Sequence, residues 1–94
     1  MRIHKSLTEL GDRLARARDE HRIVEEQLFF QNEVLEEAKT RMLVSETPLA
    51  DRAHRIARDD HQKLLEQRAR VQNDIDDLQR EQDRLLDRML GAES

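Results

Sequence analysis

The sequence predicts an all-α protein: a two-helix antiparallel coiled-coil hairpin, two copies of which associate into a four-helix bundle. Charged residues make up 40 % of the 94 residues, while two Gly and one Pro leave little material for turns. This composition argues against a β-sandwich or an α/β enzyme, which need turn residues and β-branched or aromatic strands. Apolar residues also recur every seven residues in both halves of the chain, which argues against disorder.

The first half of the chain, residues about 4–45, has the heptad pattern of a coiled-coil helix. Positions separated by alternating steps of four and three form a line of core positions, the first seam. The first seam consists of Ile3, Leu7, Leu10, Leu14, Ala17, His21, Val24, Leu28, Gln31, Leu35, Ala38 and Met42. Only His21 and Gln31 are polar. Ser6 and Glu9 match a capping box, which is a helix-start signal.

The second half, residues about 48–90, has a seam that polar residues interrupt. The second seam consists of Ala50, His54, Ala57, His61, Leu64, Arg68, Val71, Ile75, Leu78, Gln82, Leu85, Met89 and Ala92. We expect the flanking apolar residues to widen this face; they are Ala53, Leu65, Leu86 and Leu90. Gly91 suits a C-terminal cap.

A turn at residues about 46–48 separates the two seams. Thr47 is a suitable N-cap, and Pro48 is favoured at the first helical position. Because the connection is short, the helices should be antiparallel neighbours in a single hairpin over residues 1–94. The expected pairs are Ala38 with Ala57, Gln31 with Leu64, Val24 with Val71, Ala17 with Leu78 and Leu10 with Leu85. An alternative is one continuous kinked helix that pairs only between chains.

Apolar residues outside the first seam predict self-association. These are Ile23, Phe29, Phe30 and Val34, and the pairing places Leu65 at the level of Phe30. Two helices bury little area per residue, so a small hairpin needs further support. We therefore expect a homo-oligomer, a dimer, whose hairpins dock through these five residues. The alternative is that Phe30 only broadens the intramolecular face.

No constellation of residues predicts catalysis, a cofactor or a metal site. The chain has no Cys and no Gly-rich phosphate loop. His54 and His61 are seven residues apart, whereas zinc ligands on one helix lie three or four apart. Asp51 and His54 have carboxylate–His spacing, but only one copy of that motif is present. We expect a non-enzymatic protein.

The charge pattern predicts neither a nucleic-acid partner nor a membrane partner. The net charge is −4, and the two signs alternate along the chain rather than forming a basic stripe. Charge pairs at helical spacing recur, as in Glu9–Arg13, Glu37–Arg41, Glu66–Arg70 and Asp77–Arg80. No segment approaches the ~20 apolar residues that span a bilayer. The absence of Cys suits the cytoplasm, and the excess of Arg over Lys suggests a bacterial, GC-rich genome.

These features predict an interaction or adaptor protein that self-associates and presents a helical surface to another protein. Glu46 and Asp51 flank the turn, and in outline this resembles the Gre-type bacterial transcription factors, whose hairpin tip contacts RNA polymerase. These 94 residues do not include the separate globular domain of those factors. A further alternative is a subunit of a hetero-oligomeric helical bundle. Small secreted WXG-type hairpins have a Trp-x-Gly turn, which this sequence lacks.

Overall fold

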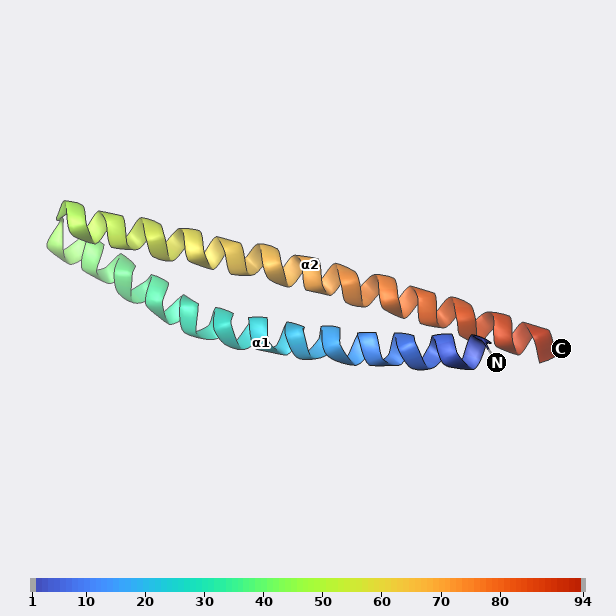
Figure 1. Ribbon diagram of the computed structural model, residues 1–94. Coiled ribbons are helices and arrows are strands. Elements are labelled where there is room, and N and C mark those ends of the chain that lie inside the picture. Colours follow the sequence, from blue (N-terminus) through green and yellow to red (C-terminus); the bar gives the residue numbers. More distant parts are fainter. Residues whose placement is uncertain (1, 94) are drawn as a thin grey trace. The chain divides into compact units, whose positions relative to one another are not determined.

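The computed structural model describes the backbone of residues 2–93 and the side chains of residues 2–91. It consists of helix α1, Arg2–Ser45, and helix α2, Pro48–Glu93. The two helices run antiparallel and are joined by a short turn (Figure 1). No strand occurs in the described residues. The predicted all-α helical hairpin is therefore confirmed.

Local chemistry explains why the turn lies where the sequence placed it. Glu46 ends α1 in the left-handed conformation, with φ 50°, and its N–H donates to the carbonyl of Met42 at 3.2 Å. This is the bond of an αL helix end. Thr47 then begins α2 as its N-cap, because the N–H of Ala50 donates to Thr47 Oγ1 at 3.2 Å. Pro48 occupies the first helical position. The predicted end of the first helix near Ser45 and start of the second at Pro48 are both confirmed.

The outer helix ends extend beyond the predicted ones. Ser6 does not cap α1, which already begins at Arg2, and Thr8 inside the helix donates its hydroxyl to the carbonyl of His4 at 3.0 Å. The first seam reaches Ile3, and packing of an amphipathic face outweighs a local capping signal. Gly91 likewise does not end α2, which continues to Glu93 without a positive φ at this glycine.

The hairpin divides into two compact units. We call Met1–His21 with Arg70–Ser94 the end unit and Arg22–Ala69 the turn unit. All nine buried hydrophobic residues of the described chain occupy seam positions, which confirms the heptad assignment. In the end unit they are Leu10, Leu14, Ala17, Val71 and Leu85; in the turn unit they are Val24, Leu28, Ala38 and Ala57. Two of the four buried residues in the turn unit are alanines, so its intramolecular core is small.

Three of the five predicted seam pairs border a common hollow, as the predicted register requires. Ala38 and Ala57 line one hollow of the turn unit. In the end unit, Ala17 lines a hollow together with Leu78, and Leu10 lines another with Leu85. The prediction that flanking apolar residues widen the second seam is largely wrong, because Ala53, Leu86 and Leu90 are exposed. Leu90 is 60 % exposed, whereas Leu86 is 37 % exposed and Ala53 borders a hollow between the two helices.

Polar bonds between the helices accompany the apolar seam. Gln31 donates from Nε2 to the carbonyl of Ala57 at 3.1 Å, which satisfies a polar residue at a core position. Arg68, also at a core position, donates to Glu25 across the turn unit at 3.3 Å. Arg18 donates to Gln79 in the end unit at 3.0 Å. Such residues restrict the register of the two helices.

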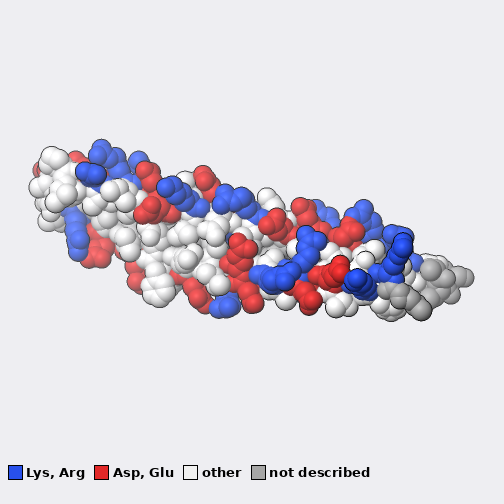
Figure 2. Space-filling model, in the orientation of Figure 1, with Lys and Arg blue, Asp and Glu red and all other residues white. Residues whose placement is uncertain are grey.

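The solvent-facing surface is covered with charges of both signs. Figure 2 shows Lys and Arg side chains interspersed with Asp and Glu side chains over the visible face. Two of the four predicted helical pairs, Glu37–Arg41 at 2.7 Å and Asp77–Arg80 at 3.2 Å, form ion pairs. Exposed pairs of this kind add at most ~0.5 kcal/mol each. Within residues 2–93, neither helix contains a stretch apolar enough to cross a bilayer.

Candidate interaction surface

Exposed apolar side chains are concentrated in the turn unit. Eight of the ten large hydrophobic residues that are exposed in the described chain lie there, and only Leu86 and Leu90 lie in the end unit. The eight are Ile23, Phe29, Phe30, Val34, Leu43, Val44, Leu49 and Ile56. Clusters of exposed apolar residues commonly mark sites where another protein binds. The turn unit is therefore the candidate interaction site.

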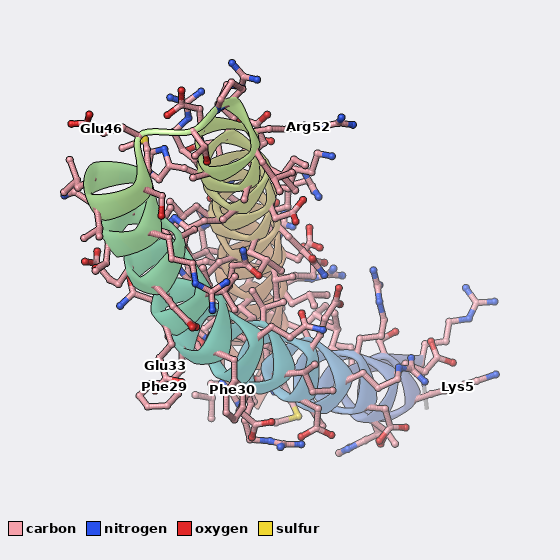
Figure 3. All side chains as sticks on the ribbon, turned by 90° about the vertical axis from the view of Figure 1, so that its left-hand side faces the viewer. Lys5, Phe29, Phe30, Glu33, Glu46 and Arg52 are labelled. Atoms are coloured by element: carbon pink, nitrogen blue, oxygen red, sulfur yellow. The ribbon has the colours of Figure 1, made fainter. Side chains whose placement is uncertain are left out.

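Phe29 and Phe30 form the most prominent part of this surface. Their rings are exposed to 65 % and 63 %, and they contact each other edge to face with ring centroids 5.6 Å apart. Both side chains project from α1 on the side away from α2 (Figure 3). A Phe30 that only broadened the intramolecular face would be covered by α2, so the exposed fraction rules out that alternative.

A small hollow lies between the two helices of the turn unit. Its volume is about 160 Å³. Apolar side chains line most of it, and an ion pair borders it. The lining residues are Val34, Glu37, Ala38, Arg41, Ala53 and Ala57. Because three of these are alanines, the two helices leave space here that no side chain of this chain fills.

The predicted interface residues do not all belong to one surface. Ile23 and Val34 are about half exposed, at 46 % and 50 %, as expected for an unpartnered face. Leu65 is only partly exposed. Ile56 is one of the exposed apolar residues on α2. Leu65 follows Ile56 by nine residues, or two and a half helical turns, so the two side chains lie on opposite sides of α2. Unlike the other four predicted interface residues, Leu65 is therefore not among the exposed large hydrophobic residues of the turn unit.

The turn itself is more apolar than the sequence suggested. Glu46, Thr47, Pro48 and Asp51, the predicted tip residues, are all exposed. Three further tip residues were missed, and their exposed fractions are high: 64 % for Leu43, 79 % for Val44 and 77 % for Leu49. Their positions in the heptad repeat could have predicted this exposure, because all three are apolar residues that lie outside the two seams.

The end unit has a different surface chemistry. One of its hollows, of about 540 Å³, has an apolar floor and a charged rim that carries both signs. The charged residues are Arg13, Arg16, Glu20, Asp74, Asp77 and Glu81. Only two large hydrophobic residues of this unit are exposed. The exposed surface of the end unit is therefore mainly charged, whereas the turn unit exposes many apolar side chains.

The histidines of the second seam are placed as core residues. His54 and His61 are each only partly exposed, in agreement with their heptad core positions. Among residues 2–93, no group of three or more His, Cys, Asp or Glu side chains is arranged to hold a metal ion.

Comparisons of the chain with protein-family models, with curated proteins and with solved structures found no match.

Proposed function

We propose that this protein is a non-enzymatic coiled-coil interaction protein that self-associates through its turn unit and presents a helical surface to another protein. The observation that carries the proposal is the concentration of eight exposed large hydrophobic residues in the turn unit. The small intramolecular core of the same unit adds to it, since Ala38 and Ala57 supply half of its buried hydrophobic residues.

The aromatic pair provides the main driving force in this proposal. Phe29 and Phe30 each leave about two thirds of their surface in water. Burying that remainder in an interface contributes ~1–2 kcal/mol for each ring, in proportion to the value for a full side chain. Aromatic residues are also enriched at the energetic centres of protein interfaces. A pair of exposed rings on a helix that exposes four further large hydrophobic residues is therefore better explained by a partner than by solvent exposure.

Light scattering on the purified chain tests self-association. The wild-type protein is expected to be a dimer at micromolar concentrations, and Phe29→Asp with Phe30→Asp is expected to give a helical monomer. Leu90→Asp is the matched control, because Leu90 is 60 % exposed but lies in the end unit. A wild-type monomer across 1–100 μM would refute homodimerisation. A monomer that copurifies with one other helical protein would favour the hetero-oligomeric bundle instead.

The tip supplies a second candidate function, contact with RNA polymerase in the manner of a Gre-type hairpin. The observation that favours it is that Glu46 and Asp51 are exposed beside three exposed apolar residues at the turn. Such a surface combines charge with apolar contact area, as protein-binding surfaces do. A pull-down with RNA polymerase tests it, and binding should be lost in the double variant Glu46→Gln and Asp51→Asn. If the double variant still binds RNA polymerase, the carboxylates of Glu46 and Asp51 are not needed for that binding.

A further inference from the structure

We propose that the part of the turn unit nearest the turn unfolds locally while the end unit stays folded. This segment comprises residues 29–67 and is called the distal arm; it contains the end of α1, the turn and the start of α2. Proteins open in cooperative segments, and segments with few buried apolar contacts open most easily. Such opening is a property of the single chain and does not depend on the proposed self-association.

The small core of the distal arm carries this proposal. All residues of the distal arm are described, and its buried hydrophobic residues are Ala38 and Ala57. Burying an alanine removes only one methyl group from water, so it stabilises a protein much less than burying a leucine. The larger apolar residues at the core positions of the distal arm are only partly buried; they are Leu35, Met42 and Leu64. The apolar contacts between its two helices are therefore few.

Polar core residues and unfilled space weaken the distal arm further. His54 and His61 occupy core positions, and both are partly buried. The hollow of about 160 Å³ lies between the two helices, so the side chains that border it lack contacts on one side. A hydrogen bond from Gln31 to the carbonyl of Ala57 links the helices, but such a bond replaces bonds to water and adds little net stability.

The end unit has the larger core, although it contains the two chain ends. Leu10, Leu14 and Leu85 are buried in it, together with Ala17 and Val71. Chain ends usually open first, because nothing tethers them, whereas a turn joins two helices covalently. We expect the reverse order in this hairpin, because the buried residues of the end unit are larger than those of the distal arm.

The turn does not compensate for the small core. Glu46 adopts the left-handed conformation there, with φ 50°, which disfavours any residue with a side chain. Most helical stability in proteins comes from tertiary packing, so helices that separate also lose their helical structure. Unfolding should therefore spread from the turn through the distal arm and expose its backbone amides to exchange with solvent.

Local unfolding also affects the candidate interaction surface. Of the eight exposed large hydrophobic residues in the turn unit, all except Ile23 belong to the distal arm. A partner that binds them in the folded hairpin also stabilises the folded state of this segment, because binding favours the state that it requires. Protection of the distal-arm amides from exchange therefore reports on partner binding.

Hydrogen exchange detected by mass spectrometry tests local unfolding. After correction for intrinsic rates, the amides of residues 34–60 should exchange at least about ten-fold faster than those of residues 9–18 and 74–85. A bound second copy would slow exchange in the distal arm, so the variant Phe29→Asp with Phe30→Asp is measured beside the wild type. A smaller difference in both proteins would overturn local unfolding. Slower exchange in the wild-type distal arm than in the variant would report self-association separately.

Leu14→Ala distinguishes local from global unfolding. Leu14 is 2 % exposed and lies in the end unit, so its truncation destabilises that unit and leaves the opening of the distal arm unchanged. Exchange should accelerate at least about ten-fold in the end unit and less than about three-fold in the distal arm. Leu90→Ala, the same substitution at an exposed position, should change neither. Equal acceleration of both units by Leu14→Ala would show that the hairpin unfolds only as a whole and would overturn the proposal.

His61→Leu supplies a measurement that needs no weakened variant. It replaces a polar core residue of the distal arm with an apolar one, so exchange there should slow by about three-fold or more. Gln62→Leu is the matched control, because Gln62 is the adjacent residue and is exposed. Equal rates in His61→Leu and the control would show that the core of the distal arm does not control its opening, which would overturn the proposal.

Discussion

Truncating Leu14 tests whether the buried seam holds the hairpin together. Leu14 is 2 % exposed, among the most buried side chains of the described residues. Leu-to-Ala substitutions in cores cost about 2–5 kcal/mol. An interface of two helices is open to solvent along both edges and relaxes more easily than a globular core. We therefore expect Leu14→Ala to lower the free energy of unfolding by ~2–3 kcal/mol, which for a domain of this size lowers Tm by about 10–20 °C.

Thermal unfolding followed by circular dichroism at 222 nm measures this loss. Protein concentration is kept constant, because association would make Tm depend on it. Leu90→Ala is the control: it is the same substitution in the same unit, but Leu90 is 60 % exposed. The gain in helix propensity is the same for both variants, and the control should change stability by less than about 0.5 kcal/mol. Equal losses in the two variants would show that the seam does not dominate stability.

Three further substitutions test the turn and the second seam by the same unfolding assay. Glu46→Gly should stabilise the hairpin by up to ~1 kcal/mol, because Gly adopts the left-handed conformation without strain. Thr47→Ala should destabilise it by ~1 kcal/mol through loss of the bond from the Ala50 N–H. His61→Leu should stabilise it by ~1 kcal/mol, because His61 is a polar residue at a partly buried core position. A change of opposite sign in any of these would contradict the corresponding assignment.

The fold could be predicted because its determinants are local and periodic. The seams follow from seven-residue spacing alone, and every buried hydrophobic residue of the described chain lies in one of them. The turn follows from Thr47 and Pro48, whose capping and backbone preferences act over a few residues. The outer ends were predicted less well, because the signals at Ser6 and Gly91 are weak beside the packing of a long amphipathic face.

The candidate site could be predicted only in part, because it depends on where side chains point around each helix. Phe29, Phe30 and Val34 stood out as apolar residues away from the first seam. The hollow could not be predicted from the sequence, since it arises where Ala38, Ala53 and the other small residues of two helices meet. Leu65 was assigned by its level along the hairpin, although its angle around α2 places it on another side.

The contrast between the two units gives the proposal its physical basis. In the end unit large apolar residues occupy the seam, while charged residues border the hollow between the helices. In the turn unit alanines lie under the hollow and the aromatic rings are exposed to solvent. A hairpin selected only for its own stability would gain by placing the larger groups inside. The turn unit instead leaves large apolar side chains exposed. We expect this pattern where another chain supplies the missing apolar contacts.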